Sequence, residues 1–532
     1  MRLHEEQPSD RLDALAFEAS ERARARSLLE SLAEAGVDVR RGVDPVLLAQ
    51  ERRLKRVLDG KAERQFRLGS EREDKAEAET LAVEIRRLTD EYDRLRAEIR
   101  SRSPRYAALT QPQPVSLRAV QEDVLDDETL VLEYSLGEER SFLWAVETQR
   151  YQVFELPSKT EVEELLQEVF HSLTARLPVA GESVQQLRAR VRGSDARYWS
   201  AASRLSEILL GPVADRLGDK RIVVVSDGTM QYLPFSALPI PSRSGEPTPL
   251  IVEHEIVSLP SVSALRMLRS QTKSREIPLL SVAVMADPVF ELDDPRIGTR
   301  KIAAKTDVSP SSVASDAGLH LSPTQRALRD VSFLGRSETG VPRLVATRRE
   351  ADSILAAAPK ETTLRALDFA ANRERAMSPD LGRYRILHFA THGLVNNQHP
   401  GLSGILLSMV DEQGNTRNGF LRLHDIYNLD LPVDLVVLSA CNTALGKPVE
   451  GEGLVGLVRG FMYAGARRVV ASLWKVDDEA TCELMGRFYN EMLQKGRSPA
   501  AALRYAQISM WQQSEWQAPF YWAAFVLQGE WS

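Results

Sequence analysis

Two short, nearly unbroken apolar runs constrain the fold most, because each ends in a side chain with useful chemistry. Residues 385–393 read Arg-Ile-Leu-His-Phe-Ala-Thr-His-Gly, and residues 435–443 read Leu-Val-Val-Leu-Ser-Ala-Cys-Asn-Thr. Such runs are typical of buried strands. From about residue 347 onward, strand-like and helix-like segments alternate to the C-terminus. This alternation predicts an α/β fold, with a mostly parallel sheet and helices on both of its faces.

The N-terminal region has a different character. Residues 12–99 are rich in Ala, Leu, Arg and Glu and poor in β-branched residues, which predicts helices. One amphipathic helix is expected over residues 11–35 and a second one after Pro45. We expect an antiparallel hairpin further on, with homodimerisation as the alternative. The hairpin residues follow the spacing of a coiled-coil seam: Leu81, Ile85, Leu88, Tyr92, Leu95 and Ile99.

Helical periodicity stops at a proline-rich segment near residue 105. The chain is therefore expected to divide into an all-α region over residues 1–105, an α/β region over residues 106–275 and a second α/β half over residues 276–532. In the middle region a β-hairpin is expected around Gly137. Its other expected elements are a helix over residues 161–177, a strand over residues 221–226 and a β-rich run over residues 250–259.

Two local features are expected in the last region. Residues 291–340 are rich in Ser, Asp, Gly and Arg with weak periodicity, which indicates a long mobile insertion. The sequence Thr347-Arg-Arg-Glu350 matches a capping box, in which the threonine would cap a helix and the glutamate would bond back to its start.

Composition gives no support to several classes of protein. The formal net charge is −7, so no basic excess points to nucleic acid. No stretch approaches the ~20 apolar residues that span a bilayer, and no signal peptide is evident, so we expect a cytoplasmic protein without a membrane partner. Only two cysteines occur, Cys441 and Cys482, which is too few for a four-cysteine zinc site or a disulfide framework. No metal or other cofactor is expected.

His392 and Cys441 form the candidate catalytic pair. In an open α/β sheet the carboxyl ends of parallel strands face one crevice, so a histidine and a cysteine that follow two such strands can share it. A nearby imidazole raises the thiolate fraction of a thiol whose ordinary pKa is ~8.5. The oxyanion of a tetrahedral intermediate also needs donors. The backbone N–H groups of Gly393 and Cys441 are the candidates.

Each of these residues also has a simpler interpretation. A single cysteine at the end of an apolar strand is usually a buried core thiol, and a single histidine there is usually structural. The separation of 49 residues favours a catalytic pair, since a catalytic histidine lies ~50 residues before the cysteine in caspases. His388 is expected to be a satisfied strand histidine rather than a metal ligand paired with His392. Cys482 is expected to pack within a helix.

The motifs occur in an order that resembles CHAT domains, a family of caspase-like and separase-like cysteine peptidases of the clan CD type. The first two are His-Phe-Ala-Thr-His-Gly and Leu-Ser-Ala-Cys-Asn-Thr; Gly451-Glu-Gly453, Ala464-Gly-Ala466 and Ala-Ser-Leu-Trp-Lys-Val-Asp-Asp at 471–478 follow. The resemblance covers about residues 200–532. It implies a caspase-like sheet and an endopeptidase with His392 and Cys441 as its dyad. The caspase signature Gln-Ala-Cys-x-Gly is absent, so cleavage after aspartate is not expected.

Further details rest on this resemblance. Residues 106–275 would form a pseudo-caspase-like N-terminal half, and residues 276–532 the catalytic half. CHAT domains are often attached to tetratricopeptide repeats, and the N-terminal helices resemble the remnant of such an array, although only about one repeat-like pair is present. The similarity to separases makes Asp477 and Asp478 candidates for an acidic pocket that binds a basic P1 residue. Helix capping is the other role open to these two aspartates.

The leading functional hypothesis is therefore a cysteine endopeptidase that acts on a protein substrate. We expect its regulation by a partner protein that the N-terminal helices bind. The alternative is a catalytically silent scaffold for protein interactions. A different thiol hydrolase or acyltransferase also stays open, because an activated cysteine does not specify the acyl group that it attacks.

Overall fold

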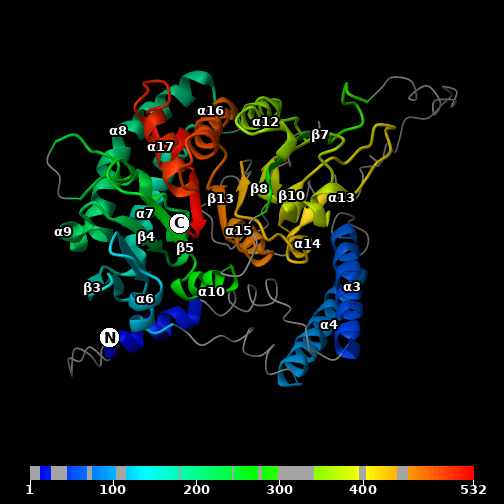
Figure 1. Cartoon of the computed structure of the whole chain (residues 1–532), viewed down its shortest axis with the longest axis horizontal. Coiled ribbons are helices and arrows are strands. Elements are labelled where there is room, and N and C mark those ends of the chain that lie inside the picture. The colour runs from blue at the N-terminus through cyan, green and yellow to red at the C-terminus, as the bar shows by residue number, and fades with distance from the viewer. Residues whose placement is uncertain are drawn as a thin grey trace.

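The computed structural model describes most of the chain (Figure 1). The described residues are 12–24, 45–68, 75–102, 115–177, 179, 181–241, 245–272, 278–297, 341–394, 403–439 and 453–531. Cys441 lies outside these ranges. So do residues 25–35 of the first expected helix and residues 298–340 of the expected insertion.

The N-terminal region is helical, as predicted. Residues 12–24 form a helix, and α3 (Pro45–Leu68) packs side by side with α4 (Lys75–Arg102). Lys61 of α3 pairs with Glu84 of α4, and Glu51 accepts a hydrogen bond from Tyr92, so the two helices run in opposite directions. Of the seam residues, Leu81, Leu88 and Ile99 are buried within the chain itself.

The helix over residues 12–24 docks on the rest of the molecule. Phe17 is fully buried and contacts Trp144 edge to face. The carboxylate of Glu21 accepts hydrogen bonds from the backbone N–H groups of Val262 and Ser263, at 3.0 and 2.6 Å. These groups open α10 (Val262–Thr272), where an anionic acceptor stabilises the unsatisfied donors of a helix.

One 11-stranded sheet runs through both α/β regions. Seven of its ten strand pairs are parallel, which confirms the predicted mostly parallel sheet. Across the sheet the order is β3 (Tyr151–Leu156), β2 (Ser141–Val146), β1 (Thr129–Ser135), β4 (Arg221–Val225), β5 (Ile256–Leu259), β14 (Phe525–Gly529), β13 (Arg468–Ser472), β12 (Leu435–Leu438), β8 (Tyr384–Ala390), β6 (Leu280–Pro288) and β7 (Thr363–Asp368).

The strand β14 joins the two halves of this sheet. It pairs parallel with β5 and antiparallel with β13. The strands of the C-terminal half therefore run opposite to β1, β4 and β5, and the carboxyl ends of the two halves lie at opposite edges. The residue Gly529 closes β14 at a φ of 112°, and a Cβ there would lie 2.5 Å from the carbonyl oxygen of Arg467.

Helices cover both faces of the sheet (Figure 1). Because right-handed crossovers that move in opposite directions place their helices on opposite faces, α12 (Ala346–Ala356), between β6 and β7, lies across the sheet from α15 (Gly453–Tyr463), between β12 and β13. The other helices are α6 (Leu117–Asp123), α7 (Lys159–Leu173), α8 (Val184–Leu209), α9 (Ala214–Leu217), α13 (Arg373–Ala376), α14 (Leu423–Ile426), α16 (Asp478–Tyr489), α17 (Pro499–Trp511) and α18 (Pro519–Trp522).

Several local predictions can be compared with this structure. The hairpin around Gly137 is confirmed by β1 and β2. Part of the expected β-rich run is wrong, because Leu250–Val252 forms a 3₁₀ turn before β5. A Cβ at Gly460 of α15 would lie 2.7 Å from Leu423 of α14, so this glycine allows the two helices to approach closely.

A smaller antiparallel sheet follows β8 directly. Its order is β11 (Phe420–Arg422), β10 (Gly404–Leu406) and β9 (Gly393–Leu394). A second, smaller hydrophobic core beside it contains Val289, Phe290, Ile297 and Val341. Ile297, near the start of the expected insertion, is therefore part of this core. Among the residues that the structure describes, none of the helices combines the length and the apolar character needed to cross a bilayer.

Candidate active site

His392 lies at the carboxyl edge of the sheet, two residues after β8. Its side chain is buried, with 5% of its surface exposed, and its ring packs against Phe290 at 5.3 Å between centroids. The Nε2 atom lies 2.7 Å from the carbonyl oxygen of Pro342. A carbonyl only accepts, so Nε2 carries the proton and donates it, and Nδ1 of the neutral ring keeps its lone pair.

The surroundings favour the neutral form of this ring. Burial and, to a smaller extent, the nearby charge of Lys475 lower the pKa of His392 to about 4, against the opposing effect of the hydrogen bond to Pro342. At neutral pH the imidazole is therefore unprotonated at Nδ1. A base in that state is ready to take a proton from a thiol.

This shift predicts a pH dependence of stability. Because the folded pKa lies below the unfolded value of ~6.5, the unfolded chain gains a proton that the folded chain does not, and stability falls as pH falls from ~6.5 towards ~4. Between pH 7 and pH 5 this one group should cost about 2 kcal/mol of unfolding free energy. Between pH 7 and pH 5 the unfolding free energy of His392→Gln, measured by urea denaturation, should fall by about 2 kcal/mol less than that of the unsubstituted protein. Equal losses would contradict the shift.

A pocket connects His392 with its neighbours at the carboxyl edge. The strand ends contribute His392, Ser439 and Ser472. The other walls are formed by the segment at the start of α12, by the loop after β13 and by the first turn of α16: Leu344, Ala346, Thr347, Glu350, Trp474, Lys475, Val476, Asp478 and Thr481.

The strand β12 leads towards Cys441. It lies beside β8 in parallel, with Leu438 opposite Phe389, and the N–H of Ser439 donates to the carbonyl of Phe389 at 3.1 Å. Cys441 itself is two residues further on and lies outside the described residues. The structure therefore describes His392 and the strand before the cysteine, at neighbouring positions of one sheet edge.

Gly393 begins the small sheet. It lies opposite Ile405, while the N–H of Leu406 donates to the carbonyl of His392 at 2.8 Å. In an antiparallel ladder this pattern makes Gly393 and Ile405 a non-hydrogen-bonded pair, whose N–H groups point away from the partner strand. Among the described strands β9 is the edge of this sheet, so the N–H of Gly393 points to its outer side.

The two aspartates after β13 have different roles. The carboxylate of Asp477 caps α16, because it accepts hydrogen bonds from the N–H groups of Glu479 and Ala480 at 3.0 and 3.1 Å. Asp478 instead lines the pocket. Partial burial raises the pKa of Asp478, the charges of Asp477 and Glu350 raise it as well, and Lys475 opposes them.

Sequence reasoning missed Glu350 as a pocket residue. The expected capping box is wrong, because the N-cap of α12 is Val345 and no side chain caps it. Glu350 is buried and lies 3.0 Å from Nε2 of His388, and Thr347 donates to the carbonyl of Leu344. The three-residue spacing placed both residues on one helix face, but no signal in the sequence indicated that this face turns inward to the pocket.

Both ring nitrogens of His388, within β8, have hydrogen-bond partners, as expected for a structural strand histidine. His388 is fully buried, with Nδ1 3.0 Å from the hydroxyl of Tyr489. Burial, followed by the charge of Glu350, raises the pKa of Tyr489 well above its ordinary value, so the phenol stays protonated and donates to Nδ1. The Nε2–H group then donates to the carboxylate of Glu350.

Cys482 contrasts with the candidate nucleophile. It lies within α16 and is partly buried. Burial raises the pKa of this thiol, and the charge of Glu350 adds to the effect. A thiol in such surroundings stays protonated and unreactive at neutral pH.

Comparison with known proteins defines the family. The sequence profile described as "CHAT domain" matches residues 200–530, which is more than half of the chain. This span contains the pocket, His392 and the strand before Cys441. The chain therefore belongs to the CHAT domain family.

Individual relatives cover smaller parts. The chain is similar to tetratricopeptide repeat protein 28 of Homo sapiens, with 36% identity over 105 residues, and to that of Mus musculus, with 36% over 113 residues. These segments are 20% and 21% of this chain but only 4% of each relative. Two crystal structures of the Saccharomyces cerevisiae separase–securin complex are similar with TM-scores of 0.46 and 0.44, at 12% and 11% identity; each alignment covers 85% of this chain and 34% of the other.

Proposed function

We propose that this protein is a cysteine endopeptidase in which His392 activates Cys441. One observation carries the proposal. The imidazole of His392 is buried and neutral, its Nε2–H is held by the carbonyl of Pro342, and its Nδ1 is left as a base at the sheet edge to which β12 leads. Two residues of chain span at most about 7 Å, so a cysteine two positions after Ser439 is within reach of the same pocket.

The reaction follows from these groups. Nδ1 of His392 takes the thiol proton of Cys441, and the thiolate adds to the scissile carbonyl carbon. The N–H groups of Gly393 and Cys441 stabilise the oxyanion, a role supported by the outward direction of the Gly393 N–H. The imidazolium then protonates the leaving amine. Water, deprotonated by the same ring, hydrolyses the resulting thioester and regenerates the thiol.

Cleavage of a peptide library tests this proposal. We expect the unsubstituted protein to cut internal peptide bonds and Cys441→Ala to cut none, with Cys482→Ala as the matched control that retains activity. Equal cleavage by all three proteins would identify a contaminating peptidase. No cleavage by any of them, with the N-terminal partner supplied, would favour the silent scaffold.

The pocket walls support a basic P1 side chain. Among the described residues of the pocket wall, Asp478 and Glu350 are acidic and Lys475 is the one lysine or arginine. The carboxylate of Asp477 is engaged in the helix cap, so the proposed contact to substrate falls mainly on Asp478.

A pair of variants tests this specificity. Asp478→Asn should lower the preference for Arg or Lys over Gln at P1 by about 1.4- to five-fold, the effect of an exposed ion pair worth about 0.2–1 kcal/mol. Asp477→Ala should leave that preference unchanged and cost about 1 kcal/mol of stability through the lost cap. Kinetics with matched peptides and urea denaturation check both. Unchanged selectivity in Asp478→Asn would refute the basic P1 side chain.

The last part of the proposal concerns regulation through the N-terminal helices. We propose that the hairpin of α3 and α4 binds a regulatory protein in the cytoplasm. Val46, Val57 and Val83 lie exposed on these helices and are the apolar side chains that such a partner would cover. A homodimer through the seam has less support, because Leu81, Leu88 and Ile99 are already buried within the chain.

A further inference from the structure

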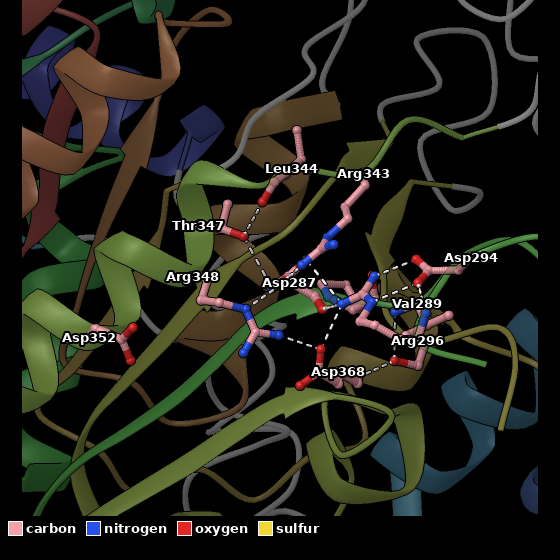
Figure 2. Close-up of polar contacts among 12 residues, drawn as sticks. Asp287, Val289, Asp294, Arg296, Arg343, Leu344, Thr347, Arg348, Asp352 and Asp368 are labelled. Atoms are coloured by element: carbon pink, nitrogen blue, oxygen red, sulfur yellow. Dashed lines mark hydrogen bonds and ion pairs between the residues drawn. The ribbon is translucent and has the colours of Figure 1, made fainter. Parts of the chain in front are cut away.

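A fully buried aspartate lies one strand away from His392, at the same edge of the sheet. Asp287, the second-last residue of β6, has no exposed side-chain surface and pairs with three arginines (Figure 2). Arg343 binds it through two parallel hydrogen bonds of 2.7 and 2.6 Å, Arg348 through one of 2.8 Å, and Arg296 lies 3.1 Å away. We call Asp287 and these three arginines the Asp287 cluster.

Two further aspartates, Asp294 and Asp368, balance the charges of the cluster. Arg296 also binds Asp294 and Asp368, and Arg348 binds Asp368 as well. A buried carboxylate is costly unless it is paired and hydrogen-bonded, and here every arginine has an acidic partner. Arg343 differs from the other two arginines. Among the ion pairs described, Asp287 alone is its acidic partner.

The backbone of the cluster is also unusual. Asp287 and Asp368 end the neighbouring strands β6 and β7, and both have positive φ, 48° and 54°. Side chains other than glycine adopt this region rarely, and they keep it where surrounding contacts hold them. The contacts that hold Asp287 include a hydrogen bond from its own N–H to the hydroxyl of Thr347, at 3.1 Å.

These contacts fasten one particular segment. Arg343 and Thr347 both bind Asp287, and the N–H of Val341 donates to the carboxylate of Glu291 at 2.9 Å, so residues 341–347 are held at three points over the carboxyl ends of the strands. Between and beside these points lie Pro342, whose carbonyl accepts from Nε2 of His392, and Leu344, which lines the pocket. The carbonyl that orients the histidine belongs to the peptide bond between Pro342 and the anchored Arg343.

We propose that Asp287 is a positioning residue: through Arg343 it holds the Pro342 carbonyl against Nε2 of His392 and so keeps Nδ1 available as the base. The catalytic part of this inference rests on the proposed peptidase function. The geometric part does not, because the tautomer and orientation of His392 can be observed without substrate.

Arg343 and Arg348 provide a matched comparison. Both side chains are 31% exposed and both bind the same carboxylate, but only Arg343 belongs to the segment that carries Pro342. Arg343→Gln should lower kcat by about 10- to 100-fold, the scale of a misplacement of about 1 Å, with KM changed much less. Arg348→Gln should keep kcat within about three-fold.

Spectroscopy of the histidine tests the geometry itself. In protein labelled with ¹⁵N-histidine, and with His392→Gln to assign the signal, His392 should appear as one neutral Nε2–H tautomer in the unsubstituted protein and in Arg348→Gln. In Arg343→Gln it should show averaged ring-nitrogen shifts and a changed titration. The charged groups that share its pocket, Lys475, Glu350 and Asp478, are the same in all three proteins.

The outcomes separate the two claims. An unchanged His392 signal in Arg343→Gln overturns the positioning role, whether or not the protein cleaves peptides. An altered signal together with no cleavage by any variant supports the positioning role and refutes the peptidase. If Arg343→Gln does not fold, Arg343→Lys is used instead. It keeps the charge but loses the two-pronged contact, so the same changes are expected at smaller size, and a signal like that of the unsubstituted protein again refutes the role.

Discussion

Replacement of His392 by alanine is expected to lower the rate of peptide cleavage by about 10²–10⁴-fold, the usual contribution of a positioned general base. Without the imidazole the Cys441 thiol, with an ordinary pKa of ~8.5, is mostly protonated at neutral pH, and no group protonates the leaving amine. Steady-state rates with a peptide taken from the library measure the loss.

The loss should depend on pH in a defined way. As the pH is raised towards ~9, the thiol ionises by itself, so the difference between His392→Ala and the unsubstituted protein should shrink. Circular dichroism at neutral pH shows whether the variant is folded. A folded His392→Ala protein with full activity would remove His392 from the mechanism.

Replacement of His388 by leucine is expected to have the largest effect on stability. The variant leaves the carboxylate of Glu350, which is only 2% exposed, without the donor at Nε2 of His388, and a buried acceptor left without its hydrogen bond typically costs about 1–3 kcal/mol, and more when it is charged. The hydroxyl of Tyr489 also loses its acceptor. Urea denaturation followed by tryptophan fluorescence measures the change in unfolding free energy.

A double variant identifies the cause. If the unpaired carboxylate is responsible, His388→Leu combined with Glu350→Met should be more stable than His388→Leu alone, because removal of both polar partners costs less than removal of one. Additive losses would indicate instead that packing of the His388 ring, and not its hydrogen bond to Glu350, determines the effect.

The sheet could be predicted largely from local patterns, except where strands pair over long distances. The apolar runs that became β8 and β12 are continuous, and the alternation with helices fixes parallel neighbours. The position of β14 could not be predicted. It is the last strand of the chain, yet it pairs with β5 some 270 residues earlier, through a register with Ser258 that no local signal encodes.

The residues of the site can also be divided into those that a local pattern indicates and those that depend on contacts distant in the chain. His392 stood out because it ends a strand and precedes glycine, and both features are local. Asp287 and Glu350 did not stand out. Asp287 is one acid after an apolar strand, and Glu350 completes a pattern that also describes a capping box. Their importance depends on which arginines and histidines the fold brings to them. Of these partners, Arg343, Arg348 and His388 lie 38–61 residues away in the chain.

The rate of alkylation of the two cysteines by iodoacetamide, measured in the same molecule by peptide mass spectrometry, tests the pairing of His392 with Cys441 most directly. Cys482 is the internal reference, since burial raises the pKa of its thiol. We predict that at pH 6.5 Cys441 reacts at least about ten-fold faster than Cys482, and that His392→Ala removes most of this difference. Equal rates at the two cysteines, or a difference that persists unchanged in His392→Ala, would contradict the pairing.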